Sequence, residues 1–453
     1  MPAGEPHTAP GTGGPCAGAG ARHDGPVPST VPDHDELELI RRSSLALRVG
    51  RLSLSAGTGS YRVKASMLRL ARAMGVDRHE AHVTLTEITT TSHRGRSFRT
   101  EVTEVRAVGI NADRLSEIER SVSRFEAQRR TTGREVDPDD VEAELDRIAS
   151  KPLLWPTVLN ALWAGVACAA FAFLNHGGVI EVLGALVGAF AGQYLRRTLL
   201  HRGLNQFGVT MLAAALALLV YLGFVELVDL TGAVSGPHEA GYVSAVLFLV
   251  PGFPLVAGAL DLARLDFSAG IARLTFAVMI LVSAALAVWA FSAVAGLAPD
   301  PPAAPTLEPG VLLVLRFVAS FVAVLGFALM FNSPWGMALA AATVGMVANV
   351  ARVYSVDAGL VPQAAAAGAA LVVGVLAAWW APRIGVPRVT LSVPAVVVMV
   401  PGVAAYRAVF HLSNGETTRA LVYGFEAALV VVALSIGLAA ARMLTDRSWG
   451  YEH

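Results

Sequence analysis

Two segments of this 453-residue chain carry the same interrupted apolar pattern, LVPGFPLVAGALDLARL at 249–265 and MVPGVAAYRAVFHL at 399–412. Val-Pro-Gly stands at 250–252 and again at 400–402, inside stretches long enough to enter a bilayer. Proline removes a backbone donor and clashes with the preceding helical turn, so each copy predicts a broken membrane helix. Matching breaks in two halves of a chain are typical of a membrane transporter and indicate where its cargo binds.

Charge divides the chain into a polar and an apolar part. Residues 1–150 contain 21 Lys/Arg and 22 Asp/Glu, whereas residues 151–453 contain only 14 and 13. Neither part has the one-sided basic field of a nucleic-acid-binding protein, so we expect no nucleic-acid partner. Cys16 and Cys168 lie in segments of different kind, which predicts neither a disulfide framework nor a thiolate metal site.

The polar part is predicted to be a cytosolic α/β domain. Residues 1–33 are rich in Gly, Pro, Ala and Thr and lack the apolar core of a secretory signal, so we expect a disordered tail followed by a cytosolic domain at 34–150. Helical spacing and end signals predict four helices, over 35–55, 61–74, 114–130 and 138–148. Alternating β-branched residues at 82–92 and 97–108 flank a turn at 93–96 and predict a β-hairpin.

The apolar part contains ten stretches of the length that crosses a bilayer core. They cover 153–174, 178–195, 206–229, 241–262, 271–296, 311–331, 334–354, 359–380, 391–411 and 419–443. The proline-rich linker at 298–310 separates five helices at 151–297 from five at 311–445, and a short tail occupies 446–453. Lys and Arg gather in alternate loops, which predicts a multi-pass protein of the cell membrane with both termini cytoplasmic. Because five is odd, the second set enters the membrane inverted, and we expect a 5+5 inverted repeat.

The two breaks supply the candidate cargo-binding residues, Pro251, Gly252, Pro254, Pro401 and Gly402. Unwound backbone and the positive N-termini of half-helices can bind an anionic or zwitterionic cargo. The alternative is a pair of simple kinks whose freed carbonyls are satisfied by neighbours or water.

Three charged residues near the breaks are further candidates. Arg407 can clamp a cargo carboxylate with its planar guanidinium, or extend to the membrane interface. Glu426 lies seven residues into the last span, where a carboxyl group is costly; it can carry the coupling proton or pair with Arg407 or Arg419. Asp261, ten residues after Pro251, is a second candidate for proton coupling, or an interfacial charge.

Other patterns argue against catalysis. The sequence HEAH at 79–82 lacks the spacing of a zinc protease, and no glycine-rich loop contains the lysine of a phosphate-binding loop, so we expect neither an enzyme nor a cofactor or metal. An ion gradient is then the default energy source. Gly184, Gly188 and Gly192 form a GxxxGxxxG run that predicts a close helix-packing face.

Three segments together resemble the threonine/serine exporter family. They are LALRVGRLSLSAGTGSYRVKASMLRLARAMGVD (45–77), VGINADRLSEIERSV (108–122) and PGFPLVAGALDLARLD (251–266). The resemblance covers about 38–445 and implies a cytosolic domain fused to ten transmembrane helices, with export of small amino acids driven by protons. Some members divide this design into two polypeptides, and certain of these resemble exporters of a small dicarboxylate. The chain departs from the family at Lys64, where an acidic residue is common.

The leading hypothesis is therefore a secondary transporter, embedded in the lipid bilayer, that exports the small amino acids threonine and serine by antiport with protons. A dicarboxylate exporter is the first alternative. A membrane sensor whose cytosolic domain gives the output is the second. The sequence is also compatible with a homo-oligomer.

Overall fold

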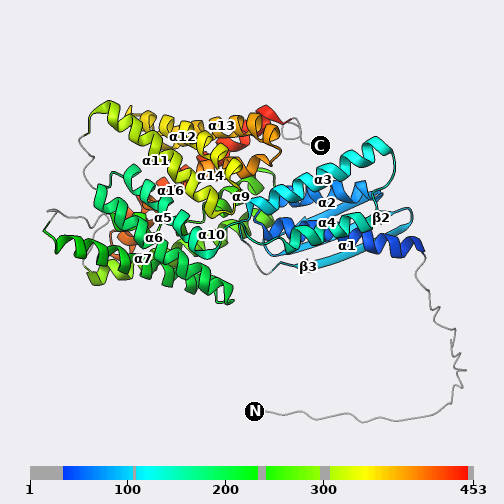
Figure 1. The fold of residues 1–453 in the computed structure, drawn as a ribbon, viewed down its shortest axis with the longest axis horizontal. Coiled ribbons are helices and arrows are strands. Elements are labelled where there is room, and N and C mark those ends of the chain that lie inside the picture. The colour runs from blue at the N-terminus through cyan, green and yellow to red at the C-terminus, as the bar shows by residue number, and fades with distance from the viewer. Residues whose placement is uncertain (1–33, 106–108, 233–240, 296–306, 447–453) are drawn as a thin grey trace, which may run out of the picture.

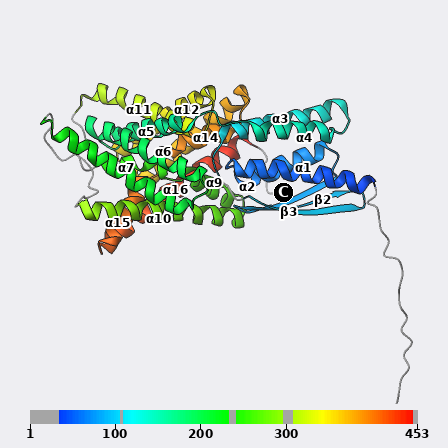
Figure 2. The ribbon, with the colours of Figure 1, turned by 60° about the horizontal axis from the view of Figure 1, so that its bottom comes forward.

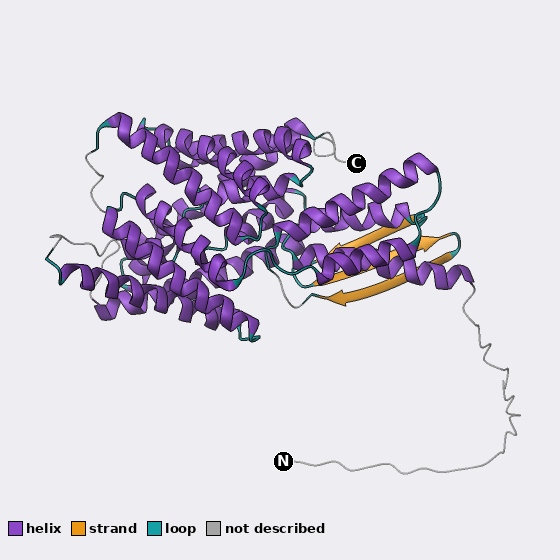
Figure 3. Ribbon diagram, in the orientation of Figure 1, coloured by secondary structure: helices purple, strands orange, loops and turns teal. Residues whose placement is uncertain are grey.

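The computed structural model describes residues 34–105, 109–232, 241–295 and 307–446. A small α/β domain and a larger helical bundle lie side by side along the long axis of the molecule (Figures 1 and 3). The expected tail at 1–33, most of the linker at 298–310 and the C-terminal tail beyond Asp446 lie outside the described residues.

Four helices lie on one side of a three-stranded sheet in the N-terminal domain, the first two against the sheet and the other two beyond them (Figure 2). The helices are α1 (His34–Ser55), α2 (Ser60–Ala73), α3 (Ala112–Thr132) and α4 (Pro138–Ser150). The strands are β1 (Arg78–Val83), β2 (Glu87–Arg94) and β3 (Ser97–Glu104), antiparallel in the order β1-β2-β3. The end signals located the helices within two residues; Asn111, for example, caps α3 by accepting a hydrogen bond from the Arg114 N–H.

The predicted hairpin is confirmed, but the prediction of one strand over 82–92 is wrong. The chain reverses at 84–87, where the Thr84 N–H donates to the Glu87 carbonyl at 2.9 Å and the Thr84 hydroxyl accepts from the Glu87 N–H at 3.0 Å. Val83 then pairs with Ile88, and the segment before the turn becomes a third strand. Threonines occupy both turn and strand positions here, so alternation alone could not locate the reversal.

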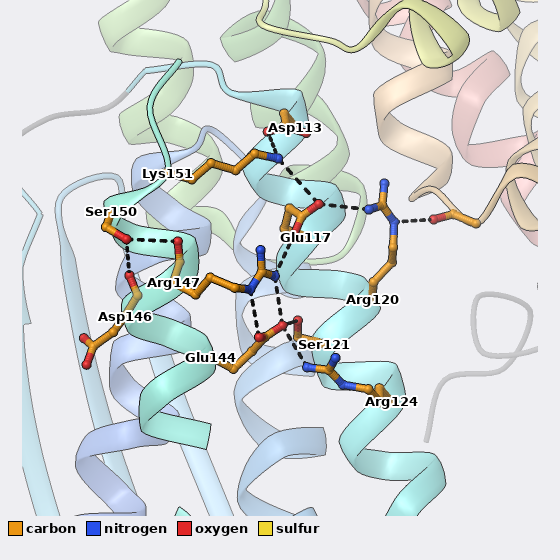
Figure 4. A network of polar contacts seen from close by, with 11 residues as sticks. Asp113, Glu117, Arg120, Ser121, Arg124, Glu144, Asp146, Arg147, Ser150 and Lys151 are labelled. Atoms are coloured by element: carbon orange, nitrogen blue, oxygen red, sulfur yellow. Dashed lines mark hydrogen bonds and ion pairs between the residues drawn. The ribbon is translucent and has the colours of Figure 1, made fainter. Parts of the chain in front are cut away.

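Arginine–carboxylate pairs join α3 to α4 (Figure 4). Arg147 donates to Glu144 at 2.9 and 3.0 Å and to Glu117 at 2.8 Å. Arg124 on α3 pairs with Glu144 at 2.8 Å. The hydrogen bond from Arg147 is the main cause that lowers the pKa of Glu144 to about 2.

The bundle contains eight helices, among the described residues, that are long and apolar enough to cross a membrane. They are α5 (Thr157–Leu174), α6 (Val179–His201), α7 (Gln206–Asp229), α10 (Phe267–Ala295), α11 (Pro309–Met330), α12 (Trp335–Asp357), α13 (Pro362–Trp380, continued by η3, Ala381–Ile384) and α16 (Thr417–Thr445). The pair α14 (Arg388–Val397) and α15 (Gly402–Ser413), bent by 48°, is apolar enough to form a ninth crossing if the two helices make one broken span rather than a re-entrant loop. The tenth expected span, 241–262, is divided into α8 (Tyr242–Ala245), η2 (Leu247–Leu249) and α9 (Gly252–Ala263), so the predicted count of ten is not confirmed.

Helix lengths recur between the two parts of the bundle. The helices α9 and α15 have 12 residues each and start 150 positions apart, and α10 and α16 have 29 residues each at the same offset. The helices α6 and α12 have 23 residues each. Rare left-handed backbone recurs as well, at His176 and Asn332 and at Leu265 and Gly415. Several helix lengths and two turns therefore recur in the same order in the two parts of the bundle.

The bundle has two hydrophobic cores, and the half-helices after the proline breaks exchange between them. Phe253, Val256 and Leu260 of α9 pack in the core formed mainly by α11, α12, α13, α14 and α16. Tyr406 of α15 packs instead in the core formed mainly by α5, α6, α7, α8 and α10. Each break thus directs its second half-helix into the core of the opposite part.

The glycine run on α6 is a close-packing face, as predicted. A Cβ added at Gly188 would lie 2.7 Å from the Ala217 carbonyl oxygen, and one at Gly192 would lie 2.8 Å from that of Ala213. Both carbonyls belong to α7, so the backbones of α6 and α7 approach too closely for larger residues.

Replacing Glu144 with glutamine is expected to weaken the α3–α4 contact by about 1–2 kcal/mol, because the charge that holds Arg124 and Arg147 is lost. Amide exchange in α4 of the full-length protein should become roughly 5- to 30-fold faster. Since the folded-state pKa of Glu144 is lowered, its contribution is present above about pH 4.5 and lost as the pH falls toward 2. Arg134→Gln in the exposed α3–α4 loop is the control; equal effects in both variants would contradict the assigned role.

Candidate functional site

The two proline breaks have the same backbone geometry. Pro251 has φ −80° and ψ 57°, and Pro401 has φ −81° and ψ 61°. The N–H groups of Gly252 and Gly402 each donate to the carbonyl two residues earlier, at 2.8 Å. These values define an inverse γ-turn, which replaces the missing helical hydrogen bond at each proline.

The breaks pack reciprocally against each other. A Cβ at Gly252 would lie 3.0 Å from the Val397 side chain, and a Cβ at Gly402 would lie 2.8 Å from Leu247 and from Val250. Leu247 and Val397 are themselves 150 positions apart, as are the two glycines. Glycine is therefore required at both breaks because each receives an apolar side chain from the other break.

The structure brings three of the eight predicted site residues together in one polar cavity, which we call the distal cavity. It has a volume of about 440 Å³ and lies at the helix ends farthest from the N-terminal domain. Pro401, Arg407 and Glu426 line it, together with residues from the ends of α5 and α12 and the starts of α8 and α13.

The other predicted residues lie elsewhere. Gly402 lines a small apolar cavity between η2, α10, α15 and α16, and Gly252 is buried against Val397. Pro251 precedes α9 and Pro254 lies in its first turn, and the distal cavity is not lined by either. The first break thus supports the packing, while the second borders the cavity.

Two arginines that are not among the predicted site residues also line the distal cavity. Arg316 on α11 pairs with Asp357 at 2.6 Å, and Arg352 on α12 donates to the Asn349 side chain at 3.1 Å. Both arginines could have been noticed in the sequence, because charged residues within apolar spans are rare.

The cavity lining therefore holds three guanidinium groups and two carboxylates. Arg407 lies over the Tyr423 ring, 5.7 Å from its centre. Arg419 pairs with Glu416 at 3.0 Å rather than with Glu426. Among the described residues, Glu426 forms no ion pair or hydrogen bond, so its carboxyl group is available to a ligand or a proton.

At the opposite end of the bundle, aromatic side chains fill the corresponding space. Trp155, Trp163 and Trp335 meet edge to face with ring centres 5.5 to 6.0 Å apart. Phe253 and Phe331 form a further edge contact at 6.2 Å. Aromatic rings therefore pack against one another on the side of the bundle that faces the N-terminal domain.

Asp261, a predicted proton-coupling candidate, lies where the N-terminal domain meets the bundle. It is fully buried and accepts hydrogen bonds from the Ser60 N–H at 3.0 and 3.2 Å. Arg273 on α10 forms an ion pair with it at 3.0 Å and donates to the Thr58 carbonyl at 2.9 Å. Asp261 thereby caps α2 and ties the start of that helix to the end of α9.

Three further contacts join the domain to the bundle. Lys64, the residue at which the chain departs from the resembled pattern, forms an ion pair with Asp266 after α9. The Asn332 side chain, in the α11–α12 turn, donates to the Asn111 side chain at 2.8 Å. The Ala112 N–H donates to the Phe331 carbonyl at 3.0 Å. The N-terminal domain therefore contacts the α9–α10 turn in the first part of the bundle and the α11–α12 turn in the second.

Comparison with known proteins gives matches over most of the chain. Residues 44–295 match the family described as "Putative threonine/serine exporter", and residues 316–444 match "Threonine/Serine exporter, ThrE". A threonine/serine exporter of Corynebacterium glutamicum is 25% identical over 93% of this chain and 84% of its own. A probable succinate transporter subunit, YjjP, of Klebsiella aerogenes is 28% identical over 57% of this chain and 96% of its own.

No solved structure matches this chain. The first family match runs from within α1 to the end of α10, and the second runs from within α11 to the last turn of α16. Together they cover the docking contacts, both proline breaks and the distal cavity. The chain belongs to the threonine/serine exporter family.

Proposed function

We propose that this protein is a secondary transporter that exports threonine and serine in exchange for protons, with the distal cavity as its cargo site. The observation that carries the proposal is the meeting of Arg407 and Glu426 beside the Pro401 break. A zwitterionic amino acid needs a cation for its carboxylate and an anion for its ammonium group. The two side chains supply both, and the N-terminus of α15 adds positive potential toward the carboxylate.

The ten segments are proposed to form a 5+5 inverted repeat with both termini in the cytoplasm. Matching helix lengths, matching left-handed turns and reciprocal packing of the two breaks support this arrangement. The YjjP relative supports it as well, since 96% of that protein's length matches only 57% of this chain. In the proposed cycle, the repeats exchange conformations, so that the packed aromatic end opens when the distal cavity closes.

Export of a small dicarboxylate is the second candidate function. Three arginines line the distal cavity against two carboxylates, and one of these, Asp357, is already paired with Arg316. Protonation of Glu426 would leave a strongly cationic site that suits two carboxylates. The printed name of the YjjP relative also concerns succinate.

Glu426→Gln is expected to abolish proton-driven export while leaving the fold intact, because glutamine fills the same space but cannot exchange a proton. Proteoliposomes loaded with labelled threonine should release it under a pH gradient with the wild type, and only at the gradient-free rate with the variant. The exposed Glu226→Gln on α7 is the control. A Glu426→Gln protein that still responds fully to the gradient excludes this residue as the proton carrier.

Arg407→Gln is expected to raise the KM for the transported cargo roughly tenfold or more, because a charge-assisted contact to a carboxylate is lost. Uptake of labelled threonine, serine and succinate should be compared in one reconstituted preparation, with Arg419→Gln as the control. Threonine and serine are expected to be transported faster than succinate; the reverse order would favour the dicarboxylate function. An unchanged KM for every transported cargo would remove Arg407 from the site.

We propose that Asp261 docks the N-terminal domain onto the bundle and does not carry the coupling proton. Asp261→Ala leaves Arg273 buried without its partner, and loss of one member of a buried pair costs about 3–5 kcal/mol. Amide exchange at 57–64 should therefore rise sharply in the full-length protein. Asp261→Asn keeps an acceptor for Ser60 and should retain transport together with partial protection. An Asn variant that stays protected but loses its response to a pH gradient would instead support proton carriage.

A further inference from the structure

The small apolar cavity beside Gly402, which we call the apolar crevice, takes no part in the transport cycle proposed above. Its volume is about 210 Å³, and it lies between η2, α10, α15 and α16. Every residue that lines it is valine, leucine, alanine or glycine, except Tyr406. The Tyr406 hydroxyl is hydrogen-bonded to that of Tyr242 at 2.9 Å, so the crevice offers a ligand apolar surface and an aromatic ring.

The crevice opens toward the lipid. Val278 and Val282 form part of its wall, and these residues are 50% and 38% exposed on α10. Both lie near the middle of this 29-residue helix, at the level of the hydrocarbon core. Two deeper wall residues, Val246 and Tyr406, are only 7% and 5% exposed. The crevice therefore runs from the lipid-facing surface of α10 into the interior of the bundle.

Small residues leave this space open. Ala405 on α15 and Gly424 on α16 line the crevice, and a Cβ added at Gly424 would have one side-chain atom of another helix within 4 Å, at 3.8 Å. The positions 150 residues earlier hold Leu255 and Leu274, which pack in the opposite core. The Leu274 side chain comes within 3.2 Å of a Cβ added at Gly258. Leucine thus fills the contact between α9 and α10, whereas alanine and glycine leave a gap between α15 and α16.

A hydrocarbon chain is the occupant that these surroundings favour. Water does not enter a cavity without polar partners, and an apolar cavity of about 150 Å³ is large enough to hold benzene. An empty cavity forfeits the dispersion contacts of its wall, which a chain from the adjacent bilayer would restore. Since lipid tails surround the opening, part of an acyl chain can enter the crevice without leaving the membrane.

The crevice and the distal cavity lie on opposite faces of one half-helix. On α15, the distal cavity is lined by Val403, Ala404 and Arg407, and the crevice is lined by residues that include Ala405, Tyr406 and Val409. At roughly 100° per residue, these two sets point to opposite sides of the helix. A chain in the crevice and a cargo in the distal cavity would therefore contact α15 from opposite sides.

We propose that the apolar crevice binds an acyl chain of a bilayer lipid, which lies between α10, α15 and α16 and supports α15 on the side opposite the distal cavity. Binding of the chain depends on the crevice alone and not on the cargo. Its effect on the movement of α15 rests on the transport function proposed above.

Photolabelling from within the bilayer tests the site. The full-length protein is reconstituted in phosphatidylcholine vesicles that contain a small fraction of the same lipid with a diazirine group in one acyl chain. After illumination, labelled residues are identified by mass spectrometry. We expect label at Val246 and Tyr406, which only a chain inside the crevice can reach, and at the exposed Phe425 on α16. Label at Phe425 without label at Val246 or Tyr406 overturns the proposal.

Filling the crevice assigns the label to it. Ala405→Leu combined with Gly424→Leu installs the side chains found 150 positions earlier and should abolish the label at the two inner residues while leaving that at Phe425. Leu429→Ala, which changes an exposed α16 residue outside the crevice, is the matched control and should retain all label. Gly424→Leu alone provides a second variant if the double variant does not fold. Persistence of the inner label in the leucine variant refutes the crevice as the binding site.

Discussion

The missing N–H group of two prolines is the constraint on which the bundle depends. At Pro251 and Pro401 a continuous helix cannot form, and both segments adopt the same inverse γ-turn. The turn redirects the chain, so that α9 packs in one core and α15 in the other. With valine or leucine from one break seated on the glycine of the other, neither turn can change without affecting its counterpart.

Local patterns were sufficient to predict most elements of the fold. The helices of the N-terminal domain begin and end where caps, prolines and glycines indicated, and the Val-Pro-Gly repeats marked both broken segments. Alternation failed at 84–87 because a threonine-rich turn has the same composition as the strands beside it. The first proline break also carries too little regular helix to count as a span by length and apolarity.

The cavity could be predicted only in part, since it depends on which helix ends converge. Pro401, Arg407 and Glu426 are close in sequence to one break, and the structure brings them together. Arg316 and Arg352 reach the same cavity from α11 and α12, and no spacing in the sequence relates them to the break. Asp261 was noted for its position ten residues after Pro251, but its partner Ser60 is distant in sequence and its partner Arg273 lies on another helix.

Corresponding positions in the two parts of the bundle carry different chemistry, and this difference bears on the proposed cycle. Asp261 and Arg273, with side chains 0% and 2% exposed, hold the end of α9 against the N-terminal domain. The residues 150 positions later, His411 and Tyr423, stack at 5.4 Å, and His411 also meets the half-exposed Glu416 at 3.0 Å. A buried ion pair is costly to separate, whereas a contact that water can reach is not. The half-helix α15 is therefore the freer of the two, and it is the one that borders the distal cavity. In the proposed exchange of conformations, movement of α15 would come first, and release of α9 would require the N-terminal domain to loosen its hold. This order gives the domain a physical means of controlling transport, because the same contacts that dock it to the bundle restrain the half-helix that must move second.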